Sequence, residues 1–427
     1  MDAADIAVVA ALVIGYSLVA RRLDRWSISM PLVFSVVGIL VGSDVLGVVD
    51  VPVDDEFVGL LAEATLVLVL FADASRIDPR RLRRFVAPPL RLLGIGFPLT
   101  VAAGTVLGLL LFPDFDVWDA ALLAAVLTPT DAALGQAVVS SPVVPERIRQ
   151  ALNVESGLND GLAVPVVAIT LAVAASTGDR SGGDWAQFVA EQIGFGVVVG
   201  VAAGSIGWVL ERAVDKGITS EGFAHLAALA TAVLAFAAAG AVGGNGFLAA
   251  FVAGVVFGSC SSMSEHVVEF AEEEGQLLSA LTFLVFGALI AGPAFSDLDA
   301  PTFAYAVGSL TVVRMLPVAA ALLGSGLRRP SVAFVGWFGP RGLASIIFAF
   351  EVLEEGEHLP AADQIGAVVT CTVLLSIMAH GVTATPLSNR LGDWVQRRHL
   401  ATDETEATAA MDAEMGEAPD LPTRRGM

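Results

Sequence analysis

The sequence predicts an all-α, polytopic membrane protein, and three observations lead to that fold class. Of the 427 residues, 55% are hydrophobic and only 16% are charged, whereas a typical soluble domain is about 25% charged. The mean hydropathy of the whole chain is +0.75. The apolar residues also fall into repeated runs of about 20 residues, the length that a helix needs to cross a bilayer. These observations argue against a soluble enzyme.

Thirteen apolar runs are the candidate membrane spans, and each is expected to be helical because lipid offers no hydrogen-bond partner to an irregular backbone. A count of twelve stays open, because the region 221–259 can be divided differently. The expected spans are 3–20, 28–49, 57–74, 92–112, 118–140, 150–175, 188–210, 221–241, 244–259, 276–294, 302–325, 331–350 and 363–388.

Basic and acidic residues alternate between successive loops. Arginines follow the first, third, fifth, eleventh and last spans, and Arg212 and Lys216 follow the seventh. Acidic residues gather in the alternate loops. Because arginine and lysine concentrate in cytoplasmic loops, we expect a multi-pass protein of the cell membrane with its N-terminus outside and its C-terminus in the cytoplasm.

No large soluble domain is expected. The predicted organisation is one transmembrane domain over 1–395, built from repeats at about 1–180 and 220–390, and an acidic, disordered cytoplasmic tail over 396–427. The formal net charge is −21, from 44 acidic and 23 basic side chains. Such an acidic surface repels the phosphates of nucleic acid, so membrane lipid is an expected partner and nucleic acid is not.

The fifth expected span contains polar residues around a proline. Thr128, Pro129, Thr130 and Asp131 lie near its middle. Pro129 lacks an N–H and clashes with the preceding turn, so the helix should kink or unwind there. Unwinding frees carbonyl oxygens, and the threonine hydroxyls and the Asp131 carboxylate add oxygens that suit a hard cation. The alternative is an ordinary proline kink whose freed backbone groups bind neighbouring Ser or Thr side chains.

The sixth expected span carries a polar face. Glu155 and Asn159 are four residues apart, as are Ser156 and Asp160, so each pair shares one side of the helix. An ionisable residue inside a span is costly and marks a functional site by default. Glu155 has a structural alternative, an ion pair with Arg314 in the eleventh span, whereas no such cation is obvious for Asp160. Asp160 is therefore the stronger candidate for a functional carboxylate.

A second broken helix is expected in the twelfth span, where Gly339, Pro340, Arg341 and Gly342 follow one another. If spans one to six and eight to thirteen form two inverted halves, the fifth and twelfth spans correspond. Paired Pro/Gly interruptions in corresponding helices indicate a transport site at the membrane midplane. Asp131 and Arg341 could then compensate the dipoles of the facing half-helix ends. A loop at the membrane boundary is the alternative interpretation of Gly339 and Pro340.

The remaining ionisable residues of the spans are weaker candidates. Asp73 lies near the cytoplasmic end of the third span, where it is either an ion ligand or a cap that faces water. His225, His266 and His380 are scattered along the chain, so a histidine proton relay is a weak hypothesis.

These ordered motifs resemble those of the monovalent cation/proton antiporters, in particular the NhaP/NHE-like branch, over nearly all of the chain up to about residue 395. Residues 128–131 are similar to the unwound-helix signature of that family, and 155–161 to its E-S-x-x-N-D-G stretch. Residues 339–342 resemble its G-x-R-G motif. Arg314 falls where the family places the arginine that pairs with the glutamate of the E-S-x-x-N-D-G stretch.

The resemblance implies a known antiporter fold, with two inverted repeats of six helices and crossed, broken helices. It implies that the ion and the proton bind at Asp160, that Ser156 and Thr130 are further sodium ligands, and that Asp131 and Asp73 contribute. No catalytic residue, enzymatic activity or cofactor is expected, and the likeness implies a homodimer. The residues expected to hold the site together are Asn159, Glu155, Arg314, Arg341 and Pro129.

The expected activity is the exchange of sodium, with lithium as a mimic, for protons by alternating access. A buried Asp160 can be neutralised by a proton or by a cation but not by both, so exchange follows if the site changes sides only when it is occupied. With Asn159 in place of a second carboxylate, the resemblance implies electroneutral one-for-one exchange.

Potassium is an alternative substrate, because selectivity depends on the size of the binding cavity. A channel and an intramembrane aspartyl protease are more distant alternatives, and the protease would need two aspartates that share a proton.

Overall fold

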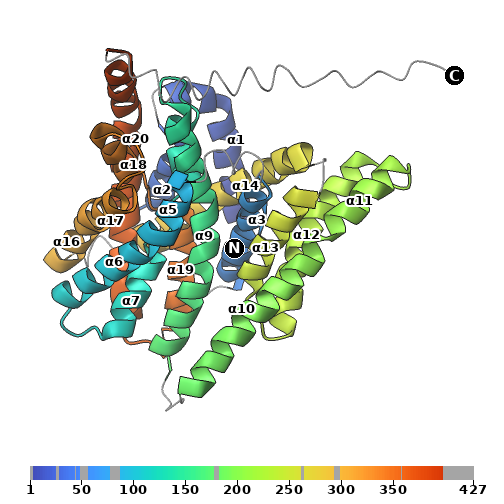
Figure 1. The fold of residues 1–427 in the computed structure, drawn as a ribbon, viewed down its shortest axis with the longest axis horizontal. Coiled ribbons are helices and arrows are strands. Elements are labelled where there is room, and N and C mark those ends of the chain that lie inside the picture. The colour runs from blue at the N-terminus through green and yellow to red at the C-terminus, as the bar shows by residue number, and fades with distance from the viewer. Residues whose placement is uncertain are drawn as a thin grey trace.

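The computed structural model describes residues 3–25, 28–43, 45–48, 56–76, 87–176, 182–260, 264–292, 299–356 and 358–397. These ranges contain helices and connecting turns but no β-strand (Figure 1). The elements up to residue 174, with η for a π-helical stretch, are α1 (Ala3–Arg25), α2 (Met30–Val41), α3 (Glu56–Ser75), α5 (Ala87–Arg91), η1 (Leu92–Gly96), α6 (Phe97–Leu111), α7 (Val117–Val126), α8 (Ala132–Val139) and α9 (Glu146–Ala174).

The second half of the chain is helical in the same way. Its long last helix contains Pro386 without ending there. The elements are α10 (Gly182–Gly204), α11 (Ile206–Asp215), α12 (Glu221–Ala241), α13 (Gly246–Cys260), α14 (Ser264–Phe286), η2 (Gly287–Ala291), α16 (Ala300–Gly308), η3 (Ser309–Val313), α17 (Arg314–Ala321), α18 (Arg329–Trp337), α19 (Leu343–Glu354) and α20 (Ala362–Arg397).

Each predicted span overlaps a helix, which confirms the all-α, multi-pass fold class. In the described ranges, eight helices are long and apolar enough to cross a membrane, and four shorter apolar helices accompany them. The ambiguous region 221–259 is divided into α12 and α13. The number of membrane crossings, the repeat boundaries and the orientation stay predictions. Of the predicted tail, 396–427, all but the end of α20 lies outside the described residues.

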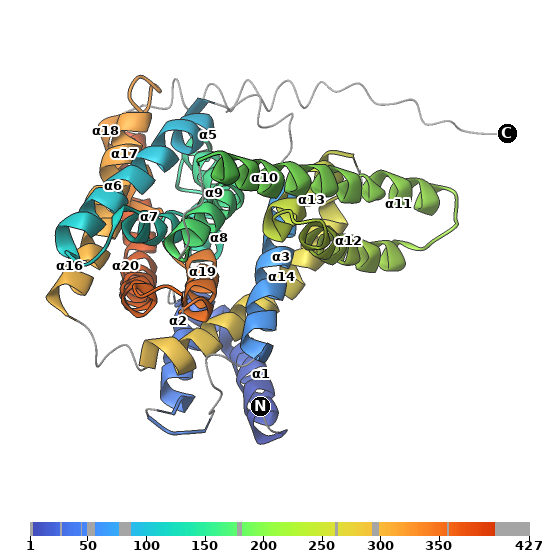
Figure 2. The same cartoon turned by 90° about the horizontal axis from the view of Figure 1, so that it is seen from below.

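The helices pack in two groups, and in Figure 1 α10 to α13 lie on the right and α16 to α18 on the left. One group contains α2, α3, α10, α12, α13 and α14, and the other contains α5 to α9 with α16 to α20. Helices α9 and α19 of the second group contact α3 of the first, so these three helices form the seam between the groups. The view from below shows the same division, with α10 to α13 on one side and α16 to α20 on the other (Figure 2).

Small residues allow close approach between the helices of the first group. Gly196, Gly200 and Gly204 recur at every fourth position of α10, and a Cβ atom added at any of them would meet α13 or the turn before it. Lipid tails are as apolar as leucine, so helices in a membrane associate through such close van der Waals contact instead of through exclusion of water. The glycine face of α10 therefore provides the packing against α13.

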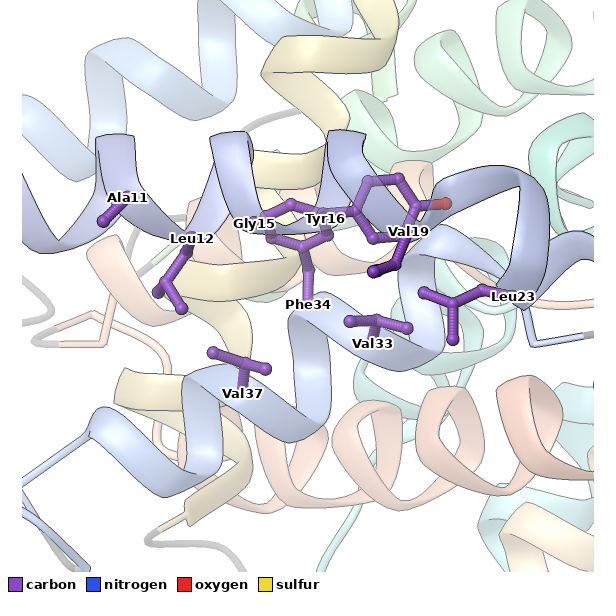
Figure 3. Close-up of a pocket in the computed structure, with 9 residues that line it drawn as sticks. All are labelled: Ala11, Leu12, Gly15, Tyr16, Val19, Leu23, Val33, Phe34 and Val37. Atoms are coloured by element: carbon purple, nitrogen blue, oxygen red, sulfur yellow. The ribbon is translucent and has the colours of Figure 1, made fainter.

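Helix α1 lies at the edge of the protein, and none of the residues from Ile6 to Leu23 is buried. An apolar crevice with a volume of about 190 Å³ separates it from α2 (Figure 3). The ring of Tyr16 packs on that of Phe34 inside this crevice, with ring centroids 5.3 Å apart. The lining side chains carry no carboxylate or amide group, so the crevice is not a candidate ion site.

Replacing Gly204 with leucine should lower the thermal midpoint of the detergent-purified protein. The new side chain would overlap the Ala253 carbonyl and press on Val256, and overpacking of this kind costs about 1–3 kcal/mol. Gly194→Leu is the matched control, because it lies on the same helix with nothing within 4 Å of its added Cβ. Equal midpoints for the two variants would contradict the close packing of α10 on α13.

Candidate functional site

The two broken helices cross at their unwound segments. Residues 127–131 separate α7 from α8, and residues 338–342 separate α18 from α19. The backbone N–H of Asp131 donates to the carbonyl of Pro340 at 2.8 Å, which ties one segment to the other. The side chain of Arg341 is fully buried, and this favours a broken helix inside the protein over a loop at the membrane boundary.

Asp131 caps the N-termini of two half-helices. Its Oδ1 atom accepts hydrogen bonds from the N–H groups of Ala133 and Leu134 at 2.7 and 3.1 Å, at the start of α8. Its Oδ2 atom accepts from the N–H of Leu343 at 2.8 Å, at the start of α19. A carboxylate in this position complements the positive ends of both helix dipoles. Gly342 is required beside it, because a Cβ atom there would overlap the Asp131 carboxylate.

Arg341 binds backbone carbonyls at the C-terminal side of α7. Its Nη1 atom donates to the carbonyls of Thr128 and Pro129, and Ser345 of α19 donates its hydroxyl to the carbonyl of Val126 at 2.7 Å. The Val126 carbonyl is the last of α7, and those of Thr128 and Pro129 follow it in the unwound segment, next to the end of the helix that carries a partial negative charge. The buried guanidinium therefore stabilises the end of α7 from the other broken helix.

Glu155 and Arg314 form a bidentate ion pair between α9 and α17. The two guanidinium Nη atoms lie 2.5 and 2.8 Å from the two carboxylate oxygens. Both residues are buried, and the Arg314 guanidinium lies against the backbone of Gly339, where a Cβ atom would overlap it. The pair therefore fastens the polar face of α9 to the second unwound segment.

Three polar side chains meet beside the first unwound segment, and Asp160 lies one turn from Ser156 on the same helix. The hydroxyls of Thr130 and Ser156 are 3.0 Å apart, and Asn159 Nδ2 donates to the Thr130 hydroxyl at 2.7 Å. Asp160 is 8% exposed. Within the described part of the chain, the Oδ1 atoms of Asp160 and Asn159 have no hydrogen-bond partner. Buried acceptors without donors are costly, so this group of oxygens suits a proton or a hard cation.

Asp73 borders this group from α3, across the seam between the two groups of helices. A Cβ atom added at Gly157 of α9 would lie 3.8 Å from the Asp73 Cβ, which places Asp73 against the helix that carries Asp160. Its side chain is 19% exposed, and its Oδ1 atom is 3.8 Å from Arg76 Nη1. The ligand roles assigned to Asp73 and Asp131 stay predictions, and the three backbone donors on Asp131 favour capping for that residue.

Polar residues of α20 also belong to the site, and sequence reasoning missed them. Ser376 Oγ accepts a hydrogen bond from the backbone N–H of Arg341 at 2.7 Å. His380, which looked isolated in the sequence, is 1% exposed and lies one turn further along the same helix. The signal that could have identified them is the spacing of four residues inside a long apolar span, which places both on one helix face.

The family model described as "Sodium/hydrogen exchanger, transmembrane" matches residues 8–390. The chain belongs to the sodium/hydrogen exchanger family. This family agrees with the antiporter likeness of the sequence motifs. The fold is that of a solved member of the family. The sodium proton antiporter MjNhaP1 from Methanocaldococcus jannaschii superimposes with a TM-score of 0.75 at 22% identity, over 91% of this chain and 98% of that one.

Two further exchanger relatives differ in the cation of their names. The chain is 28% identical over 377 residues to the K(+)/H(+) antiporter NhaP2 of Shewanella oneidensis, and this alignment covers 86% of this chain and 63% of the relative. It is 26% identical over 301 residues to the Na(+)/H(+) antiporter of Schizosaccharomyces pombe, which covers 64% of each. The chain thus spans less than two thirds of the length of both relatives.

Replacing Arg314 with alanine should reduce the yield and thermal midpoint of the exchanger far more than it changes ion preference. The substitution leaves the Glu155 carboxylate buried without its cation, which costs about 3–5 kcal/mol. The double variant Glu155→Gln with Arg314→Met removes both charges and should recover much of the midpoint, measured by fluorescence-detected size exclusion after heating. A normal yield with an altered ion preference would contradict the structural role of this pair.

Proposed function

We propose that the protein exchanges sodium for protons across the cell membrane by alternating access. The observation that carries this proposal is the buried Asp160 carboxylate, which has an oxygen without a hydrogen-bond partner among the described residues. It lies one turn of α9 from Ser156, whose hydroxyl is hydrogen-bonded to that of Thr130. A carboxylate held in this environment is costly unless a cation or a proton neutralises it. Asp160 is therefore the group that both substrates share, and Ser156 and Thr130 supply further oxygen ligands to sodium.

Competition for one carboxylate is sufficient to couple the two fluxes. A bound sodium ion and a bound proton each remove the uncompensated charge of Asp160, whereas the bare carboxylate keeps it. Moving the bare charge between the two sides of the membrane is the costly step, because a charge in a low-dielectric interior has lost its hydration. If only the neutralised forms change sides, one ion must return for each ion that leaves.

Asn159 supports an electroneutral, one-for-one stoichiometry. Its side chain stands next to Asp160 on α9, but it is an amide whose Nδ2 atom donates to Thr130 and holds that hydroxyl toward Ser156. It therefore positions a ligand without adding a second carboxylate to the site. With one carboxylate to neutralise, the site takes one sodium ion or one proton in each half of the cycle.

Sodium is the proposed substrate, and potassium is the second candidate. The description of the family and the names of the S. pombe and M. jannaschii relatives support sodium, whereas the Shewanella relative is named for potassium.

The rival functions fit the crossing less well. An aspartyl protease needs two carboxylates that share a proton, but the Asp131 carboxylate is engaged by three backbone N–H groups. A carboxylate that must be neutralised before the site can change sides favours a carrier over a channel.

The proposal also includes a homodimer and the predicted orientation, with the N-terminus outside. Alternating basic loops support the orientation, and the exposed α1 supports a contact formed by the early helices.

Proteoliposomes that contain a pH-sensitive dye test the activity directly. Adding sodium should dissipate an imposed proton gradient with the unmodified protein, and Asp160→Asn should abolish the response because the amide binds neither a proton nor a cation by charge. Asp363→Asn on the exposed start of α20 is the matched control and should respond normally. Sodium-independent dissipation, or full activity of Asp160→Asn, would refute the proposal, and a parallel series with potassium identifies the preferred cation.

Electroneutral exchange should proceed at the same rate when a membrane potential is imposed on the vesicles. A cycle that moves no net charge gains no work from the potential, whereas one net charge would gain about 2.3 kcal/mol per 100 mV. The measurement compares initial dye responses with the potential clamped at zero and at an inside-negative value. A clear acceleration by the potential would contradict the one-for-one stoichiometry while leaving the antiporter proposal intact.

A further inference from the structure

The crossing of the broken helices creates four half-helix ends inside the protein, and the contacts described above account for three of them. The N-termini of α8 and α19 share the Asp131 carboxylate, and the C-terminus of α7 is capped by Arg341. The C-terminus of α18, which ends at Trp337, is the fourth. Because the ends of a helix leave acceptors that lipid cannot satisfy, this end also needs a donor from the protein.

The donor at the end of α18 comes from α20. The Trp337 carbonyl accepts from the N–H of Gly339 at 2.9 Å, in an inverse γ-turn in which Phe338 has φ −83° and ψ 63°. His380 Nε2 lies 2.8 Å from the same carbonyl oxygen. A carbonyl only accepts hydrogen bonds, so this ring nitrogen must carry a proton. The rings of Trp337 and Phe338 pack around the imidazole, with centroids 5.3 and 6.1 Å from it.

The other ring nitrogen continues the hydrogen-bond chain toward the ion site. Ser376 Oγ lies 3.2 Å from His380 Nδ1 and accepts from the backbone N–H of Arg341, so its own hydrogen is available to Nδ1. This chain runs from the Arg341 N–H through Ser376 and His380 to the Trp337 carbonyl, and it requires a proton on Nε2 alone. Nδ1 also lies 2.8 Å from the Ser376 carbonyl, and because a carbonyl only accepts, a hydrogen bond there requires a second proton on the ring. Nε2 donates to the Trp337 carbonyl in both the neutral and the doubly protonated ring.

We propose that His380 is a positioning residue of the ion site, whose Nε2–H caps the C-terminus of α18 and, with Ser376, fastens the segment 338–342 to α20. The proposal rests on the proposed exchange activity. Histidine suits this end better than a permanent cation does, because Arg341 and the Glu155-paired Arg314 already place two guanidinium groups at the segment. The imidazole donates from Nε2 to the carbonyl whether or not Nδ1 is protonated, so the cap does not require a third permanent positive charge.

The effect of the cap on the ion site is transmitted through the backbone. The segment that His380 holds supplies the Pro340 carbonyl to the Asp131 N–H and the Leu343 N–H to the Asp131 carboxylate. Thr130 is the residue before Asp131, so its backbone position depends on the same two bonds, while Asn159 and Ser156 contact its hydroxyl. A loosened segment would therefore misplace a sodium ligand more than 200 residues away in the sequence, without any contact between His380 and the ion.

Three substitutions at one position separate capping from space filling. Glutamine can place its amide nitrogen where the imidazole has Nε2, asparagine is too short to reach the Trp337 carbonyl, and leucine fills the space without a donor. We expect His380→Asn and His380→Leu to raise the apparent KM for sodium about tenfold, since a buried carbonyl loses its side-chain donor. His380→Gln should stay within about twofold of the unmodified protein for the same reason. His358→Leu, at a histidine whose side chain is 62% exposed, is the matched control.

Initial rates in the dye assay, over a range of sodium concentrations and normalised to the reconstituted protein, give KM and the maximal rate separately. A lower yield or maximal rate with an unchanged KM in all three variants would show that His380 only fills space, and a KM for His380→Gln as high as that for His380→Leu would exclude the Nε2 donor. If His380→Leu does not accumulate, the comparison of KM between His380→Gln and His380→Asn tests the Nε2 donor.

Amide hydrogen exchange of a peptide that includes 338–343 provides a second measurement. The exchange should be faster in His380→Asn than in His380→Gln. An inactive unmodified protein would refute the exchange activity instead, and the amide measurement would still test the cap.

Discussion

The site depends on one carboxylate that holds the first turns of two helices from opposite halves of the chain. Asp131 accepts from the N–H groups of Ala133 and Leu134 on one side and of Leu343 on the other. A break in a membrane helix exposes backbone groups that lipid cannot satisfy, so it is tolerated only where protein groups replace the lost bonds. Asp131 and Arg341 do this reciprocally. Asp131 lies in the first unwound segment and accepts from Leu343 after the second, and Arg341 lies in the second and donates to Pro129 in the first. The ion-binding oxygens are built on this reciprocal crossing.

Two neighbouring carboxylates on α9 show how surroundings decide the role of a charge. Glu155 is buried against both Nη atoms of Arg314, so its negative charge is compensated and serves to join helices. Asp160, little more than one turn along the same helix, lies beside hydroxyl and amide groups and keeps an oxygen without a donor. Its charge is therefore conditional on what occupies the site. A fixed ion pair and an exchangeable one thus share a helix, and the position of one arginine distinguishes them.

The sequence predicted where the helices break and that Asp131 and Arg341 compensate the half-helix dipoles, but not which backbone groups these two side chains bind. Pro129 and Pro340 interrupt long apolar runs, and a buried Asp160 without a sequence-evident partner marks a costly charge; such signals are local and visible in one dimension. The partner of Asp131 is the N–H of Leu343, and a backbone donor leaves no trace in residue identity. The role of His380 was missed for a related reason, because it binds a backbone carbonyl across 43 positions of sequence. Capping by distant backbone groups is a property of the folded chain alone.

The placement of the oxygens on a single group of helices has an energetic consequence. Thr130 precedes α8 and Ser156, Asn159 and Asp160 lie on α9, all within the group that contains α5 to α9, whereas Asp73 belongs to the group that contains α3. A sliding of one group past the other would carry the first set as an unaltered cage and change only its separation from Asp73. An ion would then meet the same coordination on either face of the bilayer, so the affinity of the site would be similar on the two sides.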